Sequence, residues 1–209
     1  MPSPRTRSGN GRATLLESAI SNFTERGYHG TSMRDIASDA GVTVASIYHH
    51  FPSKQDILVE IMVRTMTDTI SMTREALVAS DNRPAAQLDA IVRAWTLFHT
   101  TRQREALIGA SELRSLEDEG RRLVVTLRDE QEAMFRQVID RGVSMGAFGT
   151  PYPREAARAV INMGYSIASW YRAGGSIDPD QMAERYSDLA LGTVRNKAAS
   201  ESDPAATSS

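Results

Sequence analysis

Apolar residues recur at intervals of three and four along almost the whole chain, and runs in which apolar and polar positions alternate are nearly absent. The first pattern is typical of one face of an α-helix, whereas the second would indicate a β-strand. The sequence therefore predicts an all-α protein. Glycine and proline interrupt the pattern, and the expected helices span about 12–26, 32–40, 43–49, 54–80, 84–99, 104–115, 120–145, 153–173 and 178–197.

The two short helices predicted between residues 33 and 50 have the pattern of a helix-turn-helix. Ala37 is the small residue where two helices would touch, and Gly41 suits the left-handed conformation of the turn. The second helix would then present side chains suited to base edges and phosphates in a major groove: Thr43, Val44, Ala45, Ser46, Tyr48 and His49. By itself, the Ala-x-x-x-Gly pattern is also compatible with an ordinary helical hairpin.

A longer stretch around this motif resembles the signature of the TetR family of bacterial repressors. It comprises residues 27–37 (GYHGTSMRDIA), Gly41-Val42 and residues 47–58 (IYHHFPSKQDIL). The resemblance implies that the third helix enters the major groove, that Tyr48 and Lys54 contact backbone phosphates, and that the remaining helices form a ligand-binding dimer. Lys54 would lie in the first turn of a helix, where backbone amides also point towards an anion. Thr31, before the second helix, joins the predicted DNA-binding residues.

The distribution of charge indicates a basic segment at the N-terminus. The net charge of −2 gives no support to nucleic-acid binding, but Arg5, Arg7 and Arg12 lie in the first dozen residues with no acidic residue among them. Glycine, serine and proline surround them, which disfavours a packed fold. We expect a flexible basic arm over residues 1–11 whose Arg5 and Arg7 contact DNA. An inert disordered terminus is the alternative.

These observations divide the chain into an N-terminal three-helix helix-turn-helix domain (12–53), a C-terminal helical ligand-binding and dimerisation domain (54–197) and a disordered tail (198–209) that follows it. The last two helices offer an interface for a homodimer, which would bind a pseudo-palindromic operator in double-stranded DNA. The expected interface residues follow helical spacing: Ala156, Val160, Met163, Ile167, Met182, Tyr186, Leu189 and Thr193.

The C-terminal domain is rich in methionine and aromatic residues on the apolar faces of its predicted helices. Such side chains commonly line apolar pockets between helices, although each also suits an ordinary core. The predicted ligand-binding residues are Met62, Met66, Trp95, Phe98, His99, Met134, Met163, Ile167 and Trp170. Because Met62 and Met66 share the long fourth helix with Lys54, that helix would connect the ligand to the DNA-binding domain.

A second resemblance bears on the inducer and covers about half of the C-terminal domain. Glu112-Leu113-Arg114-Ser115-Leu116, Arg128-Asp129-Glu130 and Trp170-Tyr171-Arg172 are among the residues similar to TetR-type repressors of fatty-acid, steroid and related acyl-CoA catabolism. It implies an acyl-CoA thioester with its phosphates near arginines, whose forked donors suit phosphate. A regulator of efflux that senses lipophilic cations is the alternative. Such a sensor would favour carboxylates among aromatic residues, and no clear acidic residue lies on the relevant apolar stripes.

Other motifs argue against an enzyme. Gly142-Val143-Ser144-Met145-Gly146 matches the G-x-S-x-G pattern of hydrolases, but that motif requires a preceding strand, whereas here it closes a predicted helix. The adjacent His49 and His50 would point about 100° apart and have no accompanying carboxylates, so no metal is expected. We also expect no cofactor and no membrane association. Without a signal peptide, a cysteine or an apolar run of roughly 20 residues, a cytoplasmic location is expected.

Overall fold

The computed structural model describes residues 5–195, with side chains from Gly11 onward, and every regular element in that range is a helix. The elements are α1 (Arg5–Arg26), α2 (Met33–Asp39), α3 (Val44–His50), α4 (Lys54–Ala79), α5 (Pro84–Thr101), α6 (Gln103–Ser111), the 3-10 helix η1 (Glu112–Ser115), α7 (Asp118–Ser144), α8 (Pro153–Trp170) and α9 (Pro179–Val194). The all-α prediction is confirmed.

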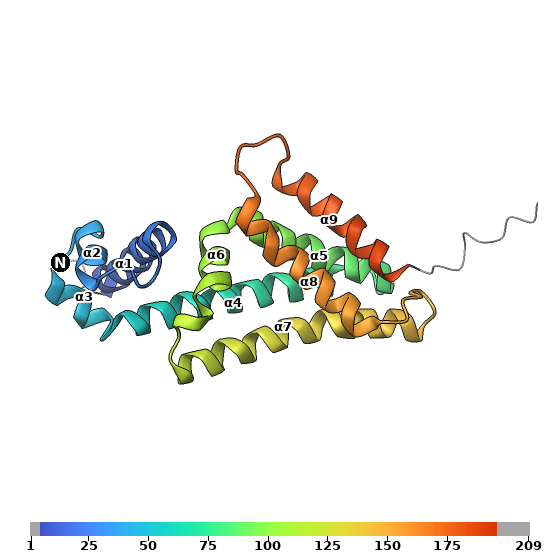
Figure 1. The fold of residues 1–209 in the computed structure, drawn as a ribbon, viewed down its shortest axis with the longest axis horizontal. Helices are drawn as coiled ribbons and strands as arrows, with labels where there is room; N and C mark the ends of the chain where they lie inside the picture. The colour runs from blue at the N-terminus through green and yellow to red at the C-terminus, as the bar shows by residue number, and fades with distance from the viewer. Residues whose placement is uncertain (1–4, 196–209) are drawn as a thin grey trace, which may run out of the picture.

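The molecule is elongated, with a small domain of α1–α3 at one end and a larger helical domain beyond it (Figure 1). The long helix α4 begins against the small domain and continues into the larger one, where α5, α6 and α7 pack against it; α8 and α9 pack on α5. The predicted tail, residues 198–209, lies outside the described residues.

Two boundaries differ from the sequence prediction. Helix α1 begins at Arg5, so most of the expected flexible arm is helical instead, and residues 1–4 lie outside the described range. Glycine costs a helix only about 1 kcal/mol per residue, so Gly9 and Gly11 do not end it. Helix α8 ends at Trp170, earlier than expected, because Tyr171 is buried and its hydroxyl donates to the Ile177 carbonyl (3.2 Å), which turns the chain towards α9.

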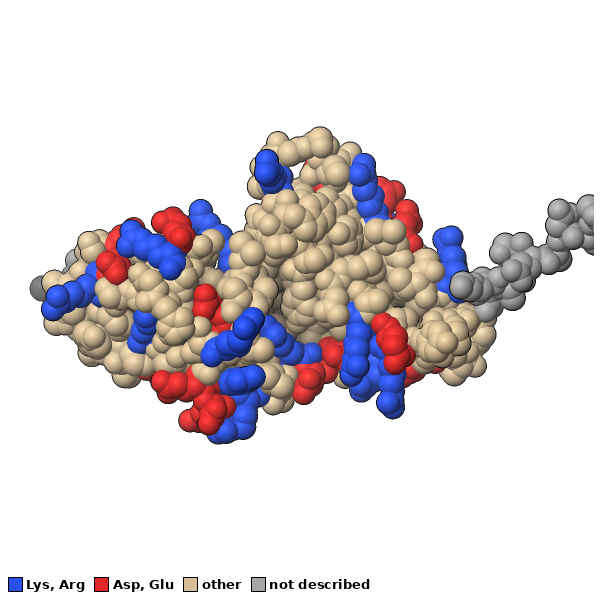
Figure 2. All heavy atoms as spheres, viewed as in Figure 1, with Lys and Arg blue, Asp and Glu red and all other residues tan. Residues whose placement is uncertain are grey.

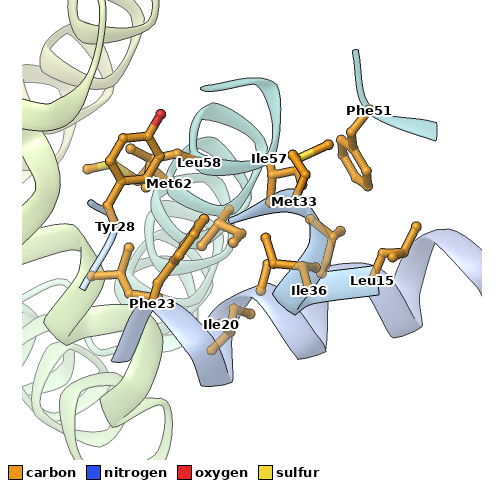
Figure 3. Packing of buried hydrophobic residues seen from close by; sticks show 14 of the residues in the cluster. Leu15, Ile20, Phe23, Tyr28, Met33, Ile36, Phe51, Ile57, Leu58 and Met62 are labelled. Carbon is orange, nitrogen blue, oxygen red and sulfur yellow. The ribbon is translucent and has the colours of Figure 1, made fainter. Parts of the chain in front are cut away.

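The small domain has a hydrophobic core formed by α1, α2 and the first half of α4. Phe23, Ile36 and Leu58 meet there from the three helices, and each is at most 3% exposed (Figure 3). Met62 belongs to the same cluster. Burial of these side chains fixes the position of α4 relative to the DNA-binding helices.

A second core lies inside the larger domain and centres on Trp95, which is 1% exposed. Its indole lies against Gly164, where an added Cβ would come within 1.9 Å of Nε1. The Trp95 Nε1–H donates to the Ile161 carbonyl (3.2 Å), and the ring makes edge-to-face contacts with His99 and Tyr165 at centroid distances of 4.3 and 5.1 Å. Glycine at position 164 is therefore what lets α8 approach α5 so closely.

His99 is 2% exposed in this core. Desolvation lowers its pKa from the usual 6.5 to about 4, although the Nδ1 contact with the Trp95 carbonyl (2.8 Å) acts in the opposite direction. The imidazole is therefore neutral at pH 7, with Nδ1–H as the donor to Trp95.

We predict that acid destabilises the protein through His99. Because the folded pKa lies below the unfolded value, the unfolded chain binds more protons between about pH 6.5 and 4. The stabilising contribution is complete above this window and is lost as the pH falls through it, by up to about 3 kcal/mol. Urea unfolding of wild type and His99→Phe at pH 7.5 and 5 measures the effect.

The His99→Phe variant should depend less on pH, whereas the exposed His49→Phe control should behave as wild type does. Parallel pH profiles for wild type and His99→Phe would contradict the assignment.

Candidate DNA-binding and ligand-binding sites

Local hydrogen bonds fix the turn between α2 and α3. Ser32 and Asp35 form a capping box at the start of α2: the Ser32 amide donates to the Asp35 carboxylate (2.8 Å), and the Asp35 amide donates to the Ser32 hydroxyl (3.2 Å). Gly41 takes the left-handed conformation that ends α2 (φ 67°), and the Thr43 hydroxyl accepts from the Ser46 amide (3.2 Å) to begin α3. The direction of α3 therefore follows from this short stretch of sequence.

Helix α3 is anchored to the domain by Ile47, its one buried residue. Val44 and Tyr48 are 39% and 51% exposed, unusually high values for such apolar or aromatic side chains. Thr43, Ala45 and His49 are also exposed, and Ser46 is half-buried. The structure thus brings six predicted DNA-binding residues to one end of the molecule, on and beside a single short helix. Contact of these side chains with DNA stays a prediction.

The structure removes Thr31 from this set. Its side chain is 2% exposed, and the hydroxyl lies 2.9 Å from the Gly27 carbonyl and 3.2 Å from that of Asn22. A hydroxyl buried against its own backbone cannot reach a phosphate, so Thr31 holds the loop between α1 and α2. Its position before α2 in the sequence gave no sign of this burial.

Lys54 also faces inwards rather than towards a phosphate. Its ammonium donates to the carbonyls of Tyr28 (2.7 Å) and Thr31 (2.6 Å) and lies 4.2 Å from the centre of the Tyr28 ring. Partial burial lowers the pKa of this ammonium. Two of its three donors therefore bind the α1–α2 loop, so in this structure Lys54 joins α4 to the helix-turn-helix domain. Its predicted phosphate contact would rest on the third donor.

Three arginines of the predicted basic segment lie in α1. Arg5 and Arg7 fall in α1, but their side chains lie outside the described residues, so their predicted DNA contacts remain untested. Arg12, considered only as part of the basic segment, donates to the His50 carbonyl (2.7 Å), pairs with Glu60 and lies over the Phe51 ring. It therefore fastens the end of α3 to α1 and α4.

A polar network, here called the domain junction, joins the two domains and consists of Tyr28, Gln55, Glu112, Ser115 and Glu117. The Gln55 Nε2 donates to the Tyr28 hydroxyl (2.9 Å) and to the Ser115 carbonyl (2.5 Å), while its Oε1 accepts from the Glu117 amide (3.3 Å). Glu112 accepts from the Tyr28 amide (3.4 Å). Gln55 thus binds both domains from α4. Nothing in the sequence pattern distinguished it from a solvated glutamine.

The predicted ligand-binding residues do not line one cavity. Met62 lies in the core of the small domain, whereas Trp95 and Met134 lie in the second core, against which the half-buried Met163 packs. Met66, Phe98, His99 and Ile167 are buried, Phe98 with Ala106 and Ala168, and Ile167 with Tyr171 and Met182. The apolar faces of the helices were identified correctly, but they face different neighbours. These residues therefore do not form the wall of a single pocket in this structure.

Trp170, which was expected to line the ligand cavity, lies at the surface instead. It is 48% exposed and stacks on Tyr186 of α9, with ring centroids 6.3 Å apart. Leu189 on the same helix is 55% exposed. By contrast, four residues expected at a dimer interface are buried within this subunit: Ala156, Val160, Ile167 and Met182. An exposed aromatic and aliphatic surface on α8 and α9 therefore remains for a second subunit.

A pocket of about 250 Å³ lies between α7 and α8, apart from the residues predicted from the sequence. Arg128, Gln131 and Glu132 of α7 and Arg158, Ile161 and Tyr165 of α8 line it. Tyr165 contacts the rings of Trp95 and His99, so two predicted residues lie directly behind its wall. Basic and acidic side chains are interspersed on the face shown in Figure 2, including the region of α7 and α8. The pocket offers both hydrogen-bond donors and apolar surface.

The remaining motifs do not form a catalytic or metal site in the described part of the chain. Ser144 closes α7, and its hydroxyl donates to the Arg141 carbonyl (2.8 Å), so the G-x-S-x-G pattern marks a helix end. No group of three or more metal-ligating side chains occurs among residues 11–195. Within the described helices, none is long and apolar enough to cross a membrane.

Both domains match known families. Residues 15–61 match the bacterial regulatory proteins of the tetR family, and residues 81–194 match the tetracyclin repressor-like C-terminal domain. The HTH-type transcriptional repressor KstR2 of Rhodococcus jostii is 34% identical over 200 residues, which cover 91% of this chain and 94% of the relative.

Solved structures agree with these matches. A tetR-family regulatory protein from Rhodococcus RHA1 superimposes with a TM-score of 0.84 at 27% identity, covering 89% of this chain and 97% of that one. AibR in complex with isovaleryl coenzyme A and operator DNA shares the fold, with a TM-score of 0.76 at 24% identity over 88% of this chain and 97% of that one. With its helix-turn-helix and its helical C-terminal domain both matched, the chain belongs to the TetR family of transcriptional regulators.

Proposed function

We propose that this protein is a homodimeric repressor that binds a pseudo-palindromic operator and is released by a small-molecule inducer, an acyl-CoA thioester. The observation that carries the DNA-binding part is the exposed outer face of α3, where Val44 and Tyr48 project from a helix whose one buried residue is Ile47. A two-fold protein presents two such helices to half-sites related by the same symmetry. A bacterial operator also implies a cytoplasmic protein.

Dimerisation is supported by the surface of α8 and α9. Trp170 and Leu189 are exposed there, and single subunits rarely leave large apolar side chains together on one face without a partner. Two copies related by a two-fold axis would pair α8 and α9 as a four-helix interface. Met163, Tyr186 and Thr193 complete the proposed interface.

The acyl-CoA class is supported by three observations. AibR, which has the same fold, was solved with isovaleryl coenzyme A and operator DNA. The C-terminal sequence resembles acyl-CoA-responsive repressors, and the pocket between α7 and α8 carries Arg128 and Arg158 beside the apolar Ile161 and Tyr165. Arginine suits the phosphates of coenzyme A, while the apolar wall suits an acyl chain.

A route from this pocket to the DNA-binding domain runs through α6 and η1. The Arg128 guanidinium donates to the Gly109 carbonyl in α6, and α6 leads into η1, whose Glu112 and Ser115 contact Tyr28 and Gln55 at the domain junction. A ligand that binds Arg128 would alter these contacts and the position of α3. This route differs from the expected one along α4. Met62, which was expected to carry the effect of the ligand into α4, lies in the small-domain core instead of a ligand cavity.

A sensor of lipophilic cations is the second candidate, and a specific groove favours it. The groove of about 570 Å³ lies between the start of α4 and the start of α7. Its carboxylates, Asp56, Glu60, Glu117 and Glu119, surround apolar side chains that include Phe51 and Val59. An aromatic cationic dye that binds the protein and releases DNA, with no effect of acyl-CoA, would favour this function.

We predict that Tyr48→Phe weakens binding to operator and to random DNA by similar factors, because a phosphate contact carries no sequence information. Loss of a hydrogen bond to a charged group costs about 1.5–3 kcal/mol, or at least a tenfold loss of affinity. Fluorescence anisotropy measures this on duplexes that the wild-type protein selects from a random pool. Tyr152→Phe, an exposed tyrosine remote from α3, is the control. Unchanged affinity of Tyr48→Phe for both DNAs would refute the contact.

We predict that Trp170→Asp with Leu189→Asp converts a dimer into monomers, because each charge would be buried without a partner at the two-fold interface. Light scattering at micromolar concentration measures the mass. Val78→Asp, at an apolar side chain on α4 that is 81% exposed, should stay dimeric. A dimeric double variant would place the interface elsewhere.

Induction itself is tested by calorimetric titration of isovaleryl-CoA into free and operator-bound protein. If the ligand weakens DNA binding, operator DNA must weaken ligand binding by the same factor, with a coupling typically of about 1–3 kcal/mol. Equal ligand affinities for the two forms would sink the induction mechanism even if the ligand binds.

A further inference from the structure

Three buried side-chain atoms of the described residues have no hydrogen-bond partner: the Thr96 Oγ1, the Arg128 Nε and the Gln131 Nε2. Leaving such a group unsatisfied costs about 1–3 kcal/mol, and native proteins satisfy most buried polar atoms. Gln131 is 1% exposed, so solvent at the surface does not compensate for the missing bond. Two of the three atoms belong to residues that line the same pocket, between α7 and α8.

The surroundings of Gln131 hold its side chain in place. Its Oε1 lies 3.1 Å from the Thr73 hydroxyl of α4, a hydroxyl that also lies 2.9 Å from the Thr69 carbonyl, and its Nε2 has no partner. Arg128, one turn earlier on α7, uses another nitrogen of its guanidinium to bind the Gly109 carbonyl and lies 5.7 Å from the centre of the Tyr165 ring. Both side chains are therefore fixed by other contacts, while one donor of each remains unused.

The unused groups have the same chemistry. An arginine Nε and an amide Nε2 are hydrogen-bond donors only, so the group that satisfies them is an acceptor oxygen. The pocket volume of about 250 Å³ is slightly below that of sites for whole drug-sized ligands, about 300–1,000 Å³. It suits one end of a larger molecule, with the remainder outside the pocket.

We propose that Arg128 and Gln131 recognise the thioester carbonyl oxygen of the inducer, so that the protein selects acyl thioesters over thioethers of the same shape. This inference rests on the proposed acyl-CoA function and assigns its specificity to two donors on one turn of α7. A ligand without that oxygen leaves both donors unsatisfied. A site built to hydrogen-bond an oxygen discriminates strongly against an analogue that lacks it.

The test compares isovaleryl-CoA with S-(3-methylbutyl)-CoA, in which a methylene group replaces the carbonyl, by calorimetric titration into the full-length protein. Hexanoyl-CoA and S-hexyl-CoA form a second pair. The wild-type protein should bind each thioester at least tenfold more tightly than its thioether. Gln131→Met, which keeps the side-chain length without a donor, should reduce the ratio by removing one of the two donors, and Arg128→Lys should also reduce it.

Gln137→Leu is the matched control, since Gln137 is an exposed glutamine on α7 outside the pocket lining, and its ratio should equal that of wild type. Thermal midpoints of all variants establish that they are folded. Equal binding of thioester and thioether by wild type, or an unchanged ratio in Gln131→Met, overturns the proposed recognition and leaves acyl-CoA induction standing. Failure of all four compounds to bind wild type overturns the acyl-CoA function together with this inference.

Discussion

The two domains depend on one shared helix, α4, and on the hydrogen bonds made by its first turn. Lys54 binds the carbonyls of the α1–α2 loop, and the neighbouring Gln55 binds both Tyr28 and the chain at Ser115 and Glu117. These groups are half-buried, so a shift of either domain would break bonds that water replaces only in part. The orientation of α3 relative to the C-terminal domain therefore depends on polar contacts at this one place.

The interior of the larger domain combines tight packing with incomplete hydrogen bonding. Trp95, His99 and Tyr165 form an aromatic cluster, and Gly164 allows α8 to lie close to Trp95. This part of the interior therefore has little room for a ligand. One layer outward, between α7 and α8, the pocket contains buried donors without partners. Rigid packing behind such a pocket holds its donors in position, which favours selection of a ligand by its polar group.

The charged residues of this protein act through local contacts and not through a large net charge. The net charge is −2, and several arginines pair with nearby carboxylates, as Arg12 does with Glu60 while it also binds the His50 carbonyl. The proposed DNA binding therefore relies on a few contacts around α3 and not on a high overall positive charge. Both hollows of the structure carry carboxylates, and the pocket between α7 and α8 differs in its two donors without partners.

The sequence alone determined the helices, the turn at Gly41 and the exposed residues of α3, because these depend on local periodicity, caps and the conformational freedom of glycine. It also indicated the TetR family. Only the tertiary structure decided that Thr31 is buried, that Lys54 points inwards, that Met62 belongs to the small-domain core and that Gln131 faces a pocket. Periodicity shows which face of a helix is buried. The neighbour that covers this face is set by how distant helices pack, which no local pattern encodes.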